Sequence, residues 1–238
     1  MISLSDRLEK IGNEVNKGET MVDLGTDHGF LPVALWERGI SPKVIMADVS
    51  EGSLNKAKEN CRLSHPDVEF DFRLGDGLKV IENGEVDAVV IAGMGGILMT
   101  EILEADLEKS WSFKKLILQP RNNVGFLRHW LYNNCYKITN EQLVREGKYI
   151  CEIITAVPIE TGVPKMMTSD RIEFEVPLKL LDFKNELTEE YIERKLNKEK
   201  SILQGIEKGN NPEFEVLRSQ QYKIDYLTYL LKKCKENR

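Results

Sequence analysis

The sequence has few residues of the kinds that build disulfide frameworks and metal centres. Its 238 residues include four cysteines and three histidines. The cysteines lie far apart with no C-x-x-C pair, so we expect reduced, partly buried thiols and neither a disulfide framework nor a zinc site. The histidines show no ligand spacing either. We therefore expect no metal cofactor.

Long apolar runs and a large excess of basic residues are also missing. No apolar stretch approaches the length that spans a membrane, and the charged start of the chain is unlike a signal peptide. We therefore expect a cytoplasmic protein with no membrane partner. The net charge is −6, and even residues 184–238 hold only 12 Lys and Arg against 10 Asp and Glu. Local basic patches would have to hold any nucleic acid.

The dinucleotide-binding motif G-x-G-x-x-G is absent as well. In its place, residues 21–32 read M-V-D-L-G-T-D-H-G-F-L-P, which predicts the end of a buried strand, a tight turn and a helix start. Asp23 precedes Gly25 by two residues, and an acid there suits a cationic or hydroxyl-bearing ligand better than a pyrophosphate. The first motif of S-adenosylmethionine (SAM) methyltransferases, [DE]-x-G-x-G-x-G, is similar, with Asp27 replacing the middle glycine. A structural turn of another α/β protein is the alternative.

Two further acids follow predicted strands. Residues 43–48 form an apolar strand that ends in Asp48. This acid lies about 20 residues beyond the glycine turn, where doubly wound nucleotide folds place the carboxylate that binds ribose hydroxyls. Asp76, between Gly75 and Gly77 after a strand over 68–73, lies in a turn that displays its carboxylate. It can accept a hydrogen bond from an adenine amine, and a plain Asx turn is the alternative.

The most hydrophobic strand, over 86–92, runs into Gly93-Met94-Gly95-Gly96 and then a helix over 97–107. Such a strand is typical of the centre of a parallel sheet that is covered on both faces. Its carboxyl end is the edge at which α/β folds bind ligands, and the glycines would let a substrate lie against bare backbone. A fifth strand and loop, over 116–123, opens onto the same edge.

The remaining elements complete one α/β domain. An amphipathic helix over 3–15, capped by Ser3 or Ser5, closes one end of the sheet or places Arg7 and Lys10 on a phosphate-binding rim. The other predicted elements are helices over 50–61 and 124–133 and two closing strands over 136–144 and 149–157.

From Asp182 the pattern changes to two helical stripes joined by a turn at 209–212. Their short connection predicts an antiparallel hairpin with coiled-coil-like packing. The hairpin is a solvated packing or dimer module, or else an RNA-gripping arm that uses Arg194, Lys195, Lys198, Lys200 and Lys208. The predicted division is a SAM-binding catalytic domain over 1–160, a linker over 161–183 and the hairpin over 184–238, in a monomer or weak dimer.

Several segments, taken in order, resemble one family. They are D-L-G-T-D-H-G-F-L-P (23–32), A-D-V (47–49), R-L-G-D-G-L (73–78), I-A-G-M-G-G (91–96) and L-I-L-Q-P (116–120). Together they resemble the bacterial tRNA (adenine-22, N1)-methyltransferases. The resemblance covers residues 3–157 and, in architecture, the hairpin. The chain departs from it at Gly29-Phe30, where the family often has A-Y, and at Arg121, where the family often has Asn.

The resemblance implies a Rossmann-like SAM-dependent methyltransferase domain followed by an α-helical coiled-coil hairpin. It implies SAM as methyl donor and N1 of adenine 22, in the D-arm region of tRNA, as acceptor. The implied cofactor-binding residues are Asp23, Gly25, Thr26, Asp27, His28, Asp48, Val49, Asp76, Gly77, Ala92 and Gly93. The implied catalytic residues are Asp27, Gly93, Met94 and Gly95, with residues 92–96 facing the target base.

N1 of adenine carries a lone pair at neutral pH, so the implied reaction needs alignment more than a strong base. We expect Asp27 to offset the positive charge that develops on the ring. The N-P-P-Y motif of amine methyltransferases is absent. Phe30, Trp130 and Tyr149 are candidates to stack on an extracted base, and each is also a candidate core residue.

Other functions stay open at this stage. The chain could be a SAM-dependent methyltransferase for another RNA, a protein or a small molecule. It could also be a non-catalytic scaffold that binds SAM or RNA. A nicotinamide dehydrogenase is a third alternative, which the absence of G-x-G-x-x-G disfavours.

Overall fold

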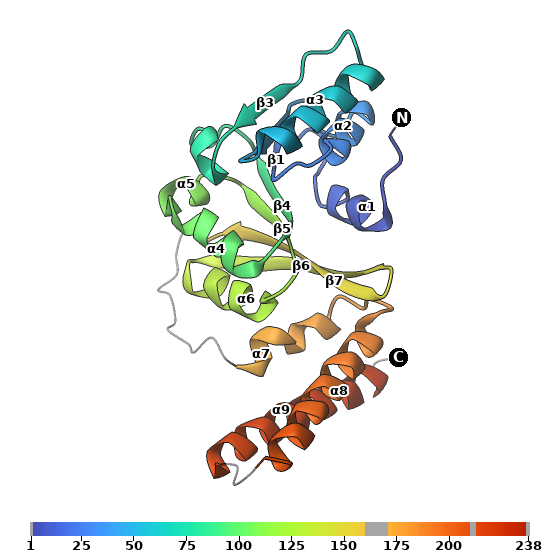
Figure 1. Cartoon of the computed structure of the whole chain (residues 1–238), viewed down its shortest axis with the longest axis vertical. Helices are drawn as coiled ribbons and strands as arrows, with labels where there is room; N and C mark the ends of the chain where they lie inside the picture. Colours follow the sequence, from blue (N-terminus) through green and yellow to red (C-terminus); the bar gives the residue numbers. More distant parts are fainter. Residues whose placement is uncertain (1, 160–170, 210–212, 237–238) are drawn as a thin grey trace.

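The computed structural model describes residues 2–159, 171–209 and 213–236, and one seven-stranded sheet forms its centre (Figure 1). The strand order is β3-β2-β1-β4-β5-β7-β6. The strands are β1 (Met21–Leu24), β2 (Val44–Asp48), β3 (Asp71–Leu74), β4 (Ala88–Met94), β5 (Lys115–Pro120), β6 (Tyr136–Glu146) and β7 (Tyr149–Pro158).

The first five strands run parallel, and β7 joins β5 and β6 in antiparallel pairs. β4 lies in the middle, and the side chains of residues 88–91 are fully buried. A continuous apolar run is stable there because helices cover both faces of the sheet. The predicted Rossmann-like α/β fold, its central strand and its two closing strands are confirmed.

Six helices cover the two faces of the sheet (Figure 1). On one face lie α1 (Asp6–Gly12), α2 (Phe30–Glu37) and α3 (Glu51–Ser64). On the other lie α4 (Gly96–Glu104), α5 (Leu107–Trp111) and α6 (Val124–Asn133), with the short 3-10 helix η1 (Gly77–Val80). Within 2–159, 171–209 and 213–236, no helix is both long and apolar enough to cross a membrane.

Helix α1 is shorter than the predicted helix over 3–15. Its cap is Ser5, whose hydroxyl accepts a hydrogen bond from the backbone N–H of Leu8 at 3.4 Å. It ends at Gly12, because glycine followed by asparagine disfavours continuation. The helix packs on β6 and β7, and this position carries Arg7 to the carboxyl ends of the strands.

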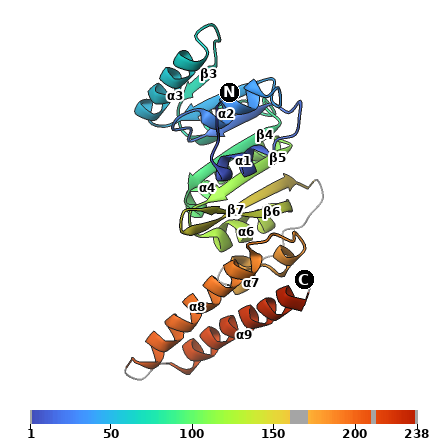
Figure 2. The same ribbon diagram turned by 90° about the vertical axis from the view of Figure 1, so that its right-hand side faces the viewer.

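The C-terminal part is a separate helical layer with its own core. It consists of α7 (Ile172–Glu175), the 3-10 helix η2 (Leu178–Leu181), α8 (Thr188–Glu207) and α9 (Phe214–Glu236). The two long helices lie side by side and extend away from the sheet (Figure 2). Leu143 of β6 contributes to the same core, so the edge strand is the docking surface for this layer.

Residues 171–183, the described half of the predicted linker over 161–183, carry α7 and η2. Ile172, Val176 and Leu180 are buried among side chains of α8 and α9. An apolar residue at every fourth position places these side chains on one side of the segment, which explains why it packs instead of spanning open space. The remainder of the predicted linker lies outside the described residues, and the domain boundaries stay a prediction.

A buried ion pair joins the sheet domain to the helical layer. The guanidinium of Arg128 on α6 donates from Nε to Glu141 Oε1 of β6 at 2.7 Å. Its Nη1 donates to the carbonyl oxygens of Phe174 and Glu175 in α7, at 2.9 and 3.0 Å. Arg128 and Glu141 are almost completely buried, so each charge depends on the other for compensation.

Replacing Arg128 by Met leaves Glu141 as a buried carboxylate without its counter-ion. We expect the free energy of unfolding to fall by about 3–5 kcal/mol in urea denaturation followed by circular dichroism. The double variant Arg128→Met/Glu141→Leu removes both charges and is expected to regain most of that loss. Equal losses in the single and the double variant would contradict this account.

Candidate active site

The parallel register brings the ends of neighbouring strands to one edge of the sheet. Leu24 of β1 pairs with Ala47 of β2 and with Ile91 of β4. The backbone N–H groups of Gly25 and Thr26 both donate to Ala47 O, at 2.8 and 3.1 Å. The glycine turn after β1 is therefore held against the end of β2, as the sequence analysis expected.

The turn after β3 is held at the same edge. The backbone N–H of Gly75 donates to Asp48 O at 3.0 Å. Asp48 Oδ1 accepts a hydrogen bond from the backbone N–H of Ser50, the cap of α3, at 2.7 Å. The second carboxylate oxygen, Oδ2, accepts nothing from the part of the chain that the structure describes, and it is a suitable acceptor for a ribose hydroxyl.

Asp23 is the half-buried acid of the site. Burial raises the pKa of its carboxyl group to about 6. The neighbouring Thr26 and the charge of Arg7 oppose this rise, and the charge of Asp48 adds to it. A half-buried carboxylate at the end of β1 is a good partner for a cationic group, because pairing would offset its loss of hydration.

Asp27 and His28 lie on the exposed outer rim of the turn. The Asp27 carboxylate forms ion pairs with Lys56 of α3 at 3.1 Å and with His28 at 3.0 Å. The hydrogen bond from Lys56 lowers the pKa of Asp27. The ring of His28 stacks on Phe30 with 5.2 Å between the centroids. The ionic partners of Asp27 thus lie on α3 and in the turn itself.

Asp76 is displayed as the sequence analysis expected. Its side chain is mostly exposed and pairs with Lys79 at 2.7 Å. Gly77 has a φ of +53°, and a Cβ there would lie 2.9 Å from Ile102 of α4. Val49, next to Asp48, is exposed at the same edge.

The glycines around the end of β4 allow close packing as well as access of a substrate to the backbone. A Cβ on Gly25 would lie 2.1 Å from Cε of Met94, so the Met94 side chain covers the first glycine turn. A Cβ on Gly96 would lie 2.5 Å from Asn123 O. Gly93 has a φ of +78° and is partly exposed, as are Ala92 and Gly95. The end of β4 thus touches the turn that follows β1.

A side-chain network beside β4 was not predicted. Arg7 of α1 donates from Nη1 to Gln119 Oε1 at 2.9 Å and from Nε to Glu146 Oε1 at 2.7 Å. The interpretation of Arg7 as part of a phosphate-binding rim is not supported, because its guanidinium is largely buried and engaged by these groups. Local periodicity placed Arg7 only on a helix surface, and no sequence signal pairs it with β5 and β6.

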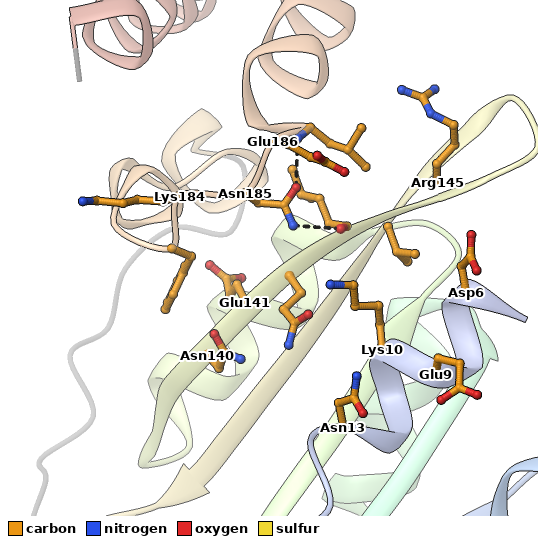
Figure 3. A pocket seen from close by; sticks show the side chains of 15 residues that line it. Asp6, Glu9, Lys10, Asn13, Asn140, Glu141, Arg145, Lys184, Asn185 and Glu186 are labelled. Atoms are coloured by element: carbon orange, nitrogen blue, oxygen red, sulfur yellow. Dashed lines mark hydrogen bonds between the residues drawn. The ribbon is translucent and has the colours of Figure 1, made fainter. Parts of the chain in front are cut away.

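A groove of about 930 Å³ is surrounded by side chains of α1, β6 and residues 183–187 (Figure 3). It holds none of the predicted cofactor-binding or catalytic residues, and its charges are mixed, with Lys10, Arg145 and Lys184 beside Asp6 and Glu186. The candidate active site is therefore the carboxyl edge of the sheet and not this groove.

Comparisons with known proteins show the family of the chain. The methyltransferase-domain family matches residues 4–154. This chain belongs to that family. The methyltransferase is 35% identical over 155 residues to the tRNA (adenine(22)-N(1))-methyltransferase of Bacillus subtilis, a match that covers 65% of each chain. The chain thus spans just under two thirds of that relative's length.

Two solved structures extend the similarity to nearly the whole chain. The crystal structure of the B. subtilis m1A22 tRNA methyltransferase superposes with a TM-score of 0.77 at 28% identity, covering 99% of both chains. A Streptococcus pneumoniae protein in complex with S-adenosyl-L-methionine gives a TM-score of 0.81 at 28% identity, covering 96% of this chain and 100% of that one. The family resemblance drawn from the sequence motifs is confirmed.

The raised pKa of Asp23 predicts a pH-dependent affinity for SAM. Only the ionised carboxylate attracts a cationic group, and the fraction ionised falls as the pH falls through about 6. We expect the dissociation constant to change little near pH 7 and to rise by up to about tenfold per pH unit below 6. Isothermal titration calorimetry between pH 5 and about 7, below the usual pKa of an α-amino group, measures it.

Two variants identify the group that titrates. Asp23→Asn is expected to bind more weakly with no such dependence. Asp48→Asn is expected to keep the dependence with its midpoint at lower pH, because the charge of Asp48 helps to raise the pKa of Asp23. Wild-type affinity that does not change across this range would contradict the assignment.

For the stability of the protein without ligand, the effect of pH has the opposite sign. Folding favours the neutral form of the Asp23 carboxyl group, so the contribution of this group to the free energy of unfolding is lost as the pH rises through about 6.

Proposed function

We propose that this methyltransferase transfers the methyl group of SAM to N1 of adenine 22 in the D-arm region of tRNA. SAM is the methyl donor, and the chain is a SAM-dependent tRNA (adenine-N1)-methyltransferase. The observation that carries the proposal is the meeting of Asp23, Asp48 and the open end of β4 at one sheet edge. The similarity to the B. subtilis enzyme and to the SAM-bound S. pneumoniae protein supports it.

In this proposal each acid at the edge holds one part of SAM. Asp48 takes the ribose hydroxyls with its free oxygen, and Asp76 with Gly77 takes the adenine of the donor. Asp23 faces the cationic methionine end, with Gly25, Thr26 and His28 around it. Bound SAM supplies an electrophilic methyl group. Val49, Ala92 and Gly93 line the remainder of the donor site.

The acceptor needs no activation by a base. The step forms a bond between N1 of adenine and the methyl carbon and breaks the carbon–sulfur bond, whose electron pair stays on sulfur. The ring gains a positive charge, and no proton has to move. The chain contributes alignment and exclusion of water, which are large effects for a reaction between two bound molecules. Gly93, Met94 and Gly95 give the purine room beside the backbone.

We propose that Asp27 offsets the positive charge on the methylated ring, provided that its present contacts allow it. Its carboxylate is engaged by Lys56 and His28. These ion pairs would have to open, or Asp27 would act over a longer distance. Because exposed ion pairs contribute little stability, opening them costs little.

We further propose that α8 and α9 form an antiparallel coiled-coil hairpin. In α9 one series of buried and half-buried residues recurs at alternating intervals of three and four residues: Leu217, Gln220, Ile224, Leu227, Leu231 and Cys234. The fully buried Leu230 lies beside this series. Gln220 Nε2 donates to Glu199 O and Oε2 of α8, both at 2.8 Å. A buried polar pair of this kind favours one register of the two helices.

Only some of the cations predicted to let the hairpin bind RNA are available for such contacts. Lys195 bonds to Glu175 at 3.0 Å, and Arg194 pairs with Glu190 at 2.7 Å. Lys198, Lys200 and Lys208 form no ion pair within the described residues. These three are the candidates for contacts with phosphate groups, which would make binding of tRNA sensitive to salt.

Incubation with labelled SAM and unmodified tRNA, followed by nucleoside mass spectrometry, tests the function. We expect 1-methyladenosine, and none when the target adenine is replaced by another base. Asp48→Asn is expected to lower the affinity for SAM with little effect on tRNA binding. SAM binding without any methylated nucleoside would overturn tRNA as the acceptor, and a chain that does not bind SAM would overturn the reaction class.

A further inference from the structure

A second cavity lies next to the end of β4, on the side away from β1. Its volume is about 470 Å³, within the range of small-ligand pockets. Arg7, Gln119, Arg121, Glu146, Tyr149 and Cys151 line it. β6 ends and β7 begins at this edge, because β6 runs antiparallel to β7, which runs antiparallel to β5. The cavity therefore opens at the same edge as the donor site.

The cavity is linked directly to the end of β4. The backbone N–H of Arg121 donates to Met94 O at 2.7 Å. The guanidinium Nε of Arg121 lies 3.7 Å from the position that a Cβ on Gly93 would occupy. Arg7 lies on the boundary between the two sites: it lines the cavity, and its charge acts on Asp23. A flat molecule in the cavity would thus lie beside Gly93.

The floor of the cavity presents hydrogen-bond acceptors in a fixed orientation. Gln119 is buried, and its Oε1 must face Arg7, because a guanidinium has only donors. Its Nε2 donates to Pro120 O at 2.9 Å. Each of these two oxygens keeps a second lone pair. An amine fits beside them, and a carbonyl oxygen at the same position would be repelled.

An exposed aromatic ring lies at the wall of the cavity. Tyr149, the first residue of β7, is 63% exposed, although it borders the cavity. Of the other two candidates for stacking, Trp130 is buried, stacked on Tyr136 and bonded to Glu104. Phe30 is stacked on His28 at the rim of the first turn. Tyr149 is the exposed aromatic ring at this cavity, and Lys148 Nζ lies over the ring at 5.2 Å from its centroid.

We propose that this cavity receives the target adenine, with Tyr149 stacked on the base and the oxygens of Gln119 and Pro120 accepting from its exocyclic amine. The inference rests on the proposed function and assigns it a base-binding site. The two acceptors distinguish adenine from guanine, which carries a carbonyl oxygen in place of the amine. Arg7 is a positioning residue, since it holds the Gln119 amide through its bonds to Gln119 and Glu146.

Steady-state kinetics of Tyr149 variants test the stacking. Tyr149→Ala is expected to lower kcat/KM for tRNA about 5- to 150-fold, the range that corresponds to the loss of one base–aromatic stack. Tyr149→Phe keeps the ring and is expected to resemble the wild type. Tyr229→Ala is the matched control, because Tyr229 is an exposed tyrosine of α9 at 49% exposure. Dissociation constants for SAM are expected to stay unchanged in all three variants.

A change of one functional group on the base tests the recognition of the amine. The tRNA carries purine riboside, which lacks the amine, in place of the target adenosine. The methylation rate of the adenosine tRNA is divided by that of the purine-riboside tRNA. We expect this ratio to be smaller in Gln119→Met than in the wild type, because the variant lacks an acceptor for the amine. Gln119→Glu keeps an acceptor oxygen beside Arg7 and is expected to keep the wild-type ratio.

The outcomes separate this inference from the proposed function. The base-binding site alone would be overturned if the wild type methylates tRNA and Tyr149→Ala is equally active. It would also be overturned if Gln119→Met leaves the ratio of the rates on adenosine and purine-riboside tRNA unchanged. Weaker SAM binding or a lower Tm in Tyr149→Ala, without recovery in Tyr149→Phe, would assign the ring a structural role and overturn the inference too. A wild type that forms no 1-methyladenosine would overturn the proposed function and the inference with it.

Discussion

The parallel pairing of β1, β2 and β4 is the constraint on which the rest of the site depends. Because these strands end level with one another, acids that lie far apart in the sequence, Asp23 and Asp48, come to one edge. The same apolar strands that maintain this register also surround Asp23 and raise the pKa of its carboxyl group. The packing of the sheet and the chemistry of the edge therefore have one physical origin.

Two guanidinium groups connect this sheet to the parts of the chain around it. Arg7 brings α1 to the ends of β5 and β6, between the donor site and the neighbouring cavity. Arg128 attaches the helical layer through Glu141 and two carbonyl groups of α7. Both use several fixed donors at once, a geometry that a lysine ammonium would not reproduce. They orient elements that apolar packing alone would hold less specifically.

Much of the fold followed from local patterns. The helix over 124–133 was predicted at its observed bounds, and the strands were placed within a few residues. The single helix predicted over 97–107 is instead two helices, α4 and α5. β4 was expected at the centre because only a strand covered on both faces has such a run. The helix over 3–15 was predicted too long, since α1 ends at Gly12. The prediction of a linker was weakest where neighbours decide, because residues 171–183 pack as α7 and η2 against the long helices.

By itself, the sequence determined the strand-to-helix turns, their acids and the family, because each depends on residues within one short segment. Tertiary structure alone decided which of these groups meet and which are already engaged. It gave Asp27 two ionic partners, left one oxygen of Asp48 without a partner among the described residues and turned Arg7 toward Gln119. These outcomes depend on strand order and on the direction of side chains from distant elements, and no local periodicity carries that information.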